Sequence, residues 1–182
     1  MKMTCIYTSP RKHGNSARVA GLLCSIAKAD HISVSEYSLH DGSYMGCVSC
    51  NACKQTAEIC VIQDDLARVL EVLPQTDLLV LALPVYCAGF NSSFMAFVER
   101  STSFFKYEDS DSPEDVRLPR GKRLIVIQTQ ASSVLEENFF FAEYFTHLGF
   151  ESQRFYCIDD SRIACQWSDV EKDVQGIWKE MA

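Results

Sequence analysis

Four cysteines are concentrated in one short segment of the chain. The segment reads GCVSCNACKQTAEIC and contains Cys47, Cys50, Cys53 and Cys60. Two residues separate each of the first three, and the fourth follows after six more. Thiolates at such close spacing can surround a single metal centre, and both zinc and iron–sulfur clusters take thiolate ligands. The segment therefore predicts a metal site, and the spacing alone leaves both metals open.

The other five cysteines are scattered along the chain. Because free cysteine is among the most buried residue types, we expect packing roles for them. A disulfide framework is not expected, since the N-terminus MKMTCIYTSPRKHG leads straight into an apolar run and leaves no room for a signal peptide. This pattern predicts a cytoplasmic protein. The scattered cysteines are Cys5, Cys24, Cys87, Cys157 and Cys165.

A second group of polar residues lies in the segment TSPRKHGNS, between an apolar run and a helical pattern. The N-terminus of a helix attracts phosphate through its free N–H groups and its dipole. Ser9, Asn15 and Ser16 can donate hydrogen bonds there, and Arg11 can add charge-assisted ones. The alternative is a solvated turn in which Asn15 is a plain helix cap. The position at the first strand–helix junction favours phosphate, although no GxGxxG dinucleotide motif occurs.

Two further loops are rich in small and polar residues. Small side chains let backbone amides approach a flat ring, and an aromatic residue can add its face or its hydroxyl. In an open doubly wound sheet, ligands bind beyond the carboxyl ends of the strands, where these loops are expected. With the phosphate turn, they predict a mononucleotide site with a planar head group. The loop residues are Pro84, Val85, Tyr86, Cys87, Ala88 and Gly89, and then Thr129, Gln130 and Ala131.

Alternating strand and helix patterns must position these groups. Apolar runs predict strands at 2–8, 32–39, 77–83, 123–129 and 151–158. Helical spacing predicts helices at 15–29, 64–73, 92–105, 135–148 and 170–180. We expect Asp64 and Asp65 at one helix start, Ser92 and Ser93 as caps of another, and Gly149 as a helix stop. Strands alternating with helices predict parallel βαβ units.

Length and charge exclude several classes of protein. A chain of 182 residues with 47% hydrophobic residues is expected to form one domain. Its net charge of −7, from 17 basic and 24 acidic residues, argues against a nucleic-acid partner, which needs a basic face. No apolar run approaches the roughly 20 residues that span a bilayer, so no membrane partner is expected.

Three motifs resemble the NADPH-dependent FMN reductase superfamily and, more narrowly, its iron–sulfur flavoprotein branch. They are SPRKHGNS, the GCxxCxxC–DD segment and PVYCAGFNSSFMAFVER, and the resemblance covers roughly residues 1–135. It implies a flavodoxin-like α/β fold, a three-layer α/β/α sandwich with a five-stranded parallel sheet in the order 2-1-3-4-5. It also implies a single FMN-binding domain over residues 1–182, with a cysteine-rich insertion at about 44–62.

The resemblance further implies the cofactors. The phosphate of FMN would lie on Ser9, Arg11, Asn15 and Ser16, and its ring against 84–89 and 129–131. Members of the iron–sulfur branch bind a [4Fe–4S] cluster, whose ligands here would be Cys47, Cys50, Cys53 and Cys60. NAD(P)H is the expected co-substrate. Members of the superfamily often form homodimers or homotetramers with the flavin near a subunit boundary.

Three functions are consistent with these patterns. The first is an electron-transfer flavoprotein that passes electrons between FMN and a [4Fe–4S] cluster, with a small molecule or a protein such as a ferredoxin-type donor as partner. The second is an NAD(P)H-dependent FMN or quinone reductase without a cluster. The third is a zinc- or redox-responsive binding protein. Zinc sites usually place their cysteines in two separated pairs, so three cysteines in one close series favour the first function.

Overall fold

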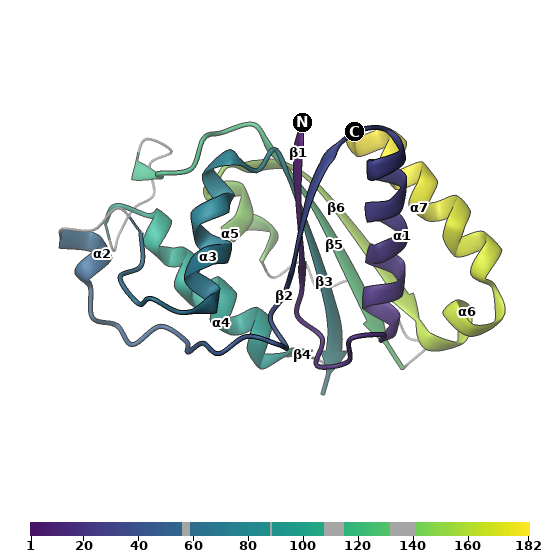
Figure 1. The fold of residues 1–182 in the computed structure, drawn as a ribbon, viewed down its shortest axis with the longest axis horizontal. Helices are drawn as coiled ribbons and strands as arrows, with labels where there is room; N and C mark the ends of the chain where they lie inside the picture. Colours follow the sequence, from purple (N-terminus) through teal and green to yellow (C-terminus); the bar gives the residue numbers. More distant parts are fainter. Residues whose placement is uncertain (56–58, 88, 108–114, 132–140) are drawn as a thin grey trace.

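A parallel β-sheet runs through the centre of the molecule between two layers of helices (Figure 1). The computed structural model describes residues 1–55, 59–87, 89–107, 115–131 and 141–182. The spatial order of the strands is β2-β1-β3-β5-β6, which is the predicted order 2-1-3-4-5 of the parallel strands. The flavodoxin-like fold is therefore confirmed. The parallel strands are β1 (Lys2–Tyr7), β2 (Ser33–Ser38), β3 (Leu78–Tyr86), β5 (Lys122–Gln130) and β6 (Phe150–Asp159).

The central strand β3 explains why its sequence is apolar without interruption. Side chains alternate between the two faces of a strand, and both faces of this sheet are covered. Leu78, Val80 and Ala82 belong to one core and Leu79, Leu81 and Leu83 to the other, all of them inaccessible to solvent. A short strand that the sequence did not predict, β4 (Gly89–Phe90), pairs antiparallel with the end of β3.

The two helical layers cover opposite faces of the sheet (Figure 1). On one face lie α1 (Asn15–Ala29), α6 (Asp160–Cys165) and α7 (Trp167–Met181). On the other lie α3 (Asp65–Val72), α4 (Ser92–Ser101) and α5 (Ala142–His147). Short 3-10 turns, Leu73–Gln75 and Thr102–Phe104, continue α3 and α4. Of the predicted helix at 135–148, residues 135–140 lie outside the described part of the chain.

The helix ends correct one prediction, that of the α4 cap, and do not support the alternative of Asn15 as a helix cap. Asn91, rather than Ser92 or Ser93, caps α4, and its side chain accepts the Phe94 N–H. Gly14, rather than Asn15, is the N-cap residue of α1. In both cases the residue just before the first helical one keeps an extended backbone, and this conformation defines a cap. The predicted stop at Gly149 is confirmed by its φ of 103°, which favours glycine.

Between β2 and α3 the chain leaves the sheet and runs outward past α4 (Figure 1). This connecting segment contains the four clustered cysteines and one short helix that the sequence did not predict, α2 (Ala52–Gln55). Among the helices of the described residues, none is long and apolar enough to cross a membrane.

Candidate functional site

A cavity of about 190 Å³ opens beyond the carboxyl ends of β1, β3 and β5. It gathers the predicted phosphate turn and both predicted ring loops in one place. Cys87 and Gly89 do not line it, and Ala88 lies outside the described residues. The lining residues are Ser9, Arg11, Gly14, Asn15, Ser16, Pro84, Val85, Tyr86, Thr129, Gln130, Ala131 and Asp160.

Strand register brings these loops together. Pro84 lies opposite Thr129 in the parallel pairing of β3 with β5. Thr8, just after β1, donates both its N–H and its hydroxyl to the carbonyl oxygen of Ala82, at 3.0 and 3.2 Å. The ends of the three strands therefore meet at one edge of the sheet. Segments that are far apart in the sequence become neighbours there.

The phosphate turn is compact. The Ser9 hydroxyl accepts the Arg11 N–H at 3.1 Å, and Gly14 donates its N–H to the Arg11 carbonyl oxygen at 3.0 Å. A Cβ atom at Gly14 would lie 3.2 Å from that oxygen, which is closer than side chains usually approach. No side chain of the described residues caps α1. Its first-turn N–H groups therefore remain available to an anion.

Asp160 is a lining residue that the sequence analysis missed. It lies at the start of α6, directly after β6, and its Oδ1 accepts a hydrogen bond from Asn15 Nδ2 at 2.6 Å. The contact joins residues 145 positions apart. A sequence signal existed, because Asp160 follows the last predicted strand at its carboxyl end. The carboxylate adds a negative charge to the cavity that Arg11 also lines.

The four clustered cysteines line a second, smaller cavity of about 40 Å³. Cys47 and Cys50 are exposed, Cys53 is half-buried and Cys60 is buried. The cavity has room for about one water molecule. In the described residues, no three Cys, His, Asp or Glu side chains are arranged to hold a metal ion. The fold thus gathers the thiols around one space without an assembled metal site.

The charges around this second cavity are mixed. Burial raises the pKa of the Cys53 thiol above its ordinary value; Lys54 opposes this rise, and the neighbouring thiols add to it. Lys54 donates hydrogen bonds to the carbonyl oxygens of Thr102 and Phe105, both at 2.7 Å. Arg100 lines the same cavity, as does the carboxylate of Glu99. The cavity therefore places two cations beside four thiols.

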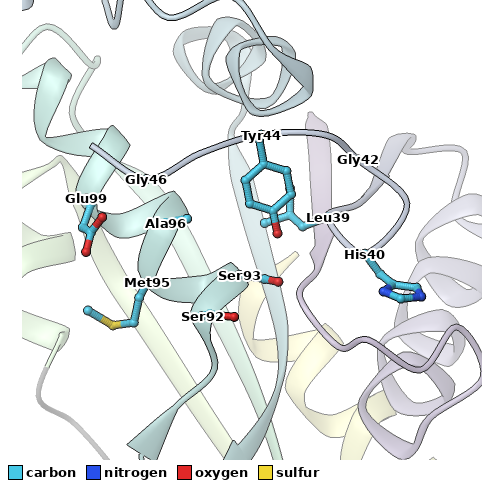
Figure 2. A pocket seen from close by; sticks show the side chains of 10 residues that line it. All are labelled: Leu39, His40, Gly42, Tyr44, Gly46, Ser92, Ser93, Met95, Ala96 and Glu99. Carbon is cyan, nitrogen blue, oxygen red and sulfur yellow. The ribbon is translucent and has the colours of Figure 1, made fainter. Parts of the chain in front are cut away.

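A third cavity, of about 550 Å³, lies between the loop after β2 and α4 (Figure 2). Figure 2 shows Tyr44 pointing from this loop toward Ser93 on the helix. Glu99 lines both this cavity and the cysteine cavity. The lining residues are Leu39, His40, Gly42, Tyr44, Gly46, Ser92, Ser93, Met95, Ala96 and Glu99.

The scattered cysteines divide into two groups. Packing roles are confirmed for Cys5, Cys24 and Cys157, which are buried. The same expectation is wrong for Cys87 and Cys165, which are exposed. Cys87 has a φ of 51°, because it lies in the tight turn that joins β3 to β4.

Most of the chain, including the flavin-type loops and the cysteine segment, matches a known family. The sequence profile of the NADPH-dependent FMN reductase family covers residues 1–133. The chain belongs to this family. This match confirms the family resemblance seen in the sequence motifs.

Within the NADPH-dependent FMN reductase family, the curated relatives include iron–sulfur flavoproteins. Those of Methanosarcina thermophila and Methanocaldococcus jannaschii are each 30% identical over 101 residues, which are 56% of this chain and 52% of the relative. The match thus spans about half the length of these relatives.

Solved structures of two oxidoreductases share the fold. An FMN-dependent NADH-azoreductase from Bacillus anthracis superposes with a TM-score of 0.75 over the full length of both chains, at 15% identity. An NAD(P)H:quinone oxidoreductase from Methanothermobacter marburgensis gives a TM-score of 0.69 at 10% identity, over 97% of this chain and 96% of the other.

Proposed function

We propose that this chain is an FMN-dependent electron-transfer oxidoreductase that exchanges electrons between FMN and a [4Fe–4S] cluster. One observation carries the proposal: the phosphate turn and both ring loops line one cavity, and all four clustered cysteines line another. We further propose that residues 1–182 form a single FMN-binding domain with the cysteine segment as an insertion at about 44–62.

In the first cavity, the FMN phosphate would lie on Ser9, Arg11, Asn15 and Ser16. The uncapped N-terminus of α1 supports this assignment, because its N–H groups suit a phosphate. Ser9 and Ser16 are buried, so their hydroxyls are shielded from competing water. Arg11 is exposed and supplies the positive charge at the rim.

The ring would lie against 84–86 and 129–131. Typical cofactor sites have volumes of about 300–1,000 Å³. The 190 Å³ cavity is smaller, so it would enclose the phosphate end and leave the ring at the surface. Tyr86, at 42% exposure, lies at this surface. Bound FMN accepts electrons singly or as a hydride, and an exposed ring would suit NAD(P)H or another redox partner as donor.

The chemistry of the second cavity fits an iron–sulfur cluster. Four thiols are the complete donor set for such a cluster, and they line one space. The nearby cations Lys54 and Arg100 would offset part of the negative charge of the thiolates. Metal ligation requires thiolates, so loading the site would release protons from the four thiols. Relatives named iron–sulfur flavoproteins add support.

The two sites would be joined through α4. Asn91, just before the helix, donates to the carbonyl oxygen of Thr8, the residue after β1, and Arg100 near the end of the helix lines the cysteine cavity. At 1.5 Å per residue, these two positions are roughly 14 Å apart along the helix axis. A homodimer or homotetramer, and a small molecule or ferredoxin-type protein as redox partner, remain part of the proposal.

Anaerobic purification followed by iron, sulfide and flavin analysis tests the proposal. We expect about one FMN, about four iron atoms and about four sulfides per chain, with flavin and cluster bands in the visible spectrum. FMN without iron would instead support an NAD(P)H-dependent FMN or quinone reductase. One observation favours this alternative: no three potential ligand side chains of the described residues are arranged to hold a metal ion. Zinc without flavin would support a binding protein.

A further inference from the structure

Arg100 is a charged side chain buried inside the α3–α4 layer. The residue is 1% exposed, and none of its side chain is accessible to solvent. A buried charge is costly unless it is paired. Here Nη1 and Nη2 donate to the two carboxylate oxygens of Asp64, at 2.8 and 3.3 Å. Such a two-point pair fixes the orientation of the guanidinium plane.

The same guanidinium holds both ends of the cysteine segment. Nη1 donates to the carbonyl oxygen of Met45 at 3.1 Å, and Nη2 donates to that of Ile62 at 2.9 Å. Asp64 also accepts the Met45 N–H at 3.3 Å. Met45 lies two residues before Cys47, and Ile62 two residues after Cys60. Arg100 and Asp64 therefore close the base of the segment that carries the four thiols.

One N–H group of the Arg100 guanidinium has no hydrogen-bond acceptor among the described residues. This group, at Nε, is buried. Buried donors without acceptors are rare, and each calls for an explanation. Arg100 lines the cysteine cavity. Burial lowers the pKa of Arg100, but the Cys60 sulfur is near enough to its guanidinium to attract it electrostatically and through a weak hydrogen-bond contact, both of which raise that pKa. The free donor therefore lies beside the space that the thiols surround.

We propose that Arg100 is a positioning residue for the cysteine centre. Its two Nη atoms hold the ends of the segment at 45 and 62, and its Nε donates a hydrogen bond to a sulfur atom of the bound centre. This inference rests on the proposed function. A hydrogen bond and a positive charge beside cluster sulfur stabilise the reduced, more negative state, so Arg100 raises the reduction potential.

The substitution Arg100→Lys tests this role, because lysine keeps the charge but cannot make the planar contacts or supply Nε. The matched control is Arg117→Lys, since Arg117 also donates to two backbone carbonyl oxygens, those of Ser103 and Phe105, without itself lining the cysteine cavity. We expect R100K to lose iron to a chelator at least tenfold faster and to have a more negative cluster potential, with FMN binding unchanged. R117K should match the wild type.

A cluster in R100K with wild-type potential and wild-type iron release would overturn the inference and leave the proposed function intact. Wild-type protein without iron would overturn the proposed function. In that case, amide hydrogen exchange on the metal-free proteins tests whether Arg100 holds the two ends of the segment. Exchange in R100K that is tenfold faster than in the wild type, and only within 45–62, supports this role. Unchanged exchange refutes it. If R100K does not fold, Asp64→Asn tests the orientation of the guanidinium instead. Asparagine can still cap α3 but loses the charge that pairs with Arg100, so iron release should again be faster than in the wild type and wild-type release would count against the inference.

Discussion

Asn91 makes two hydrogen bonds that face in different directions. Its Oδ1 accepts the Phe94 N–H at 3.1 Å and so caps α4, while its Nδ2 donates to the carbonyl oxygen of Thr8 at 2.6 Å. Thr8 is the residue that leads from β1 into the phosphate turn. The start of α4 is therefore joined to the turn after β1, and its other end, at Arg100, to the cysteine segment.

Substitutions of Asn91 separate these two bonds. Serine is a good cap but cannot reach Thr8, whereas alanine loses both bonds. We expect N91A to lower the free energy of unfolding by about 1–2 kcal/mol and N91S to lower it less. Both should weaken FMN binding, because the turn loses its anchor. Chemical denaturation and flavin titration measure the two effects. Wild-type FMN affinity in N91S would show that the Thr8 bond does not position the turn.

Arg11 is expected to act on the phosphate alone. A charge-assisted hydrogen bond contributes about 1.5–3 kcal/mol, so Arg11→Ala should weaken FMN binding by roughly ten- to a hundredfold. Riboflavin, which lacks the phosphate, should bind R11A and wild type equally well. Lys12→Ala is the control, since Lys12 is the next residue but does not line the flavin cavity. Fluorescence titration with both flavins distinguishes the outcomes, and an equal loss for riboflavin would contradict the assignment.

The cysteine assignment predicts a selective loss of iron. Cys50 and Cys165 are both exposed, but only Cys50 lines the cysteine cavity. We expect Cys50→Ser to lose most of its iron and sulfide while keeping FMN, and Cys165→Ser to keep all three. Metal and flavin analysis of anaerobic preparations is the measurement. A C50S protein with full iron content would exclude Cys50 as a ligand.

Asp64 predicts a dependence of stability on acid. Burial alone would raise the pKa of its carboxyl, but hydrogen bonds from Arg100 and from the N–H groups of Ala67 and Met45 outweigh burial and lower that pKa. A carboxyl whose pKa is lower in the folded state stabilises the fold above its unfolded pKa of about 3.9. This contribution is lost as the pH falls through the folded pKa.

Asp64→Asn makes this contribution measurable. The substitution leaves a buried guanidinium unpaired, so we expect a loss of roughly 3 kcal/mol at neutral pH. The difference from wild type should shrink as the pH falls below about 4, because the wild-type carboxyl is then neutralised as well. Denaturation of the metal-free proteins across this range is the measurement. A difference that stays constant down to a pH of about 2 would refute the ionic role of Asp64.

Much of this protein follows from local sequence. In the run 78–83, both the odd-numbered and the even-numbered residues are apolar, and this predicts a strand covered on both faces. The phosphate turn and the loops at 84–86 and 129–131 can be grouped from their positions in the chain, because the carboxyl ends of parallel strands meet at one edge. The spacing of the four cysteines identified them as one group, and they do line one cavity.

Other features depended on the tertiary structure. Asp160 joins the flavin cavity, Asn91 binds Thr8, and Arg100 closes the cysteine segment through contacts that span 145, 83 and up to 55 residues. Asn91 and Arg100 look like an ordinary polar residue and an ordinary helix charge in the sequence. Periodicity reveals which side of an element is buried, but it does not reveal the partner that a buried polar group meets. That partner is set by how separate elements pack, and packing alone decided which charged side chain binds both ends of the cysteine segment.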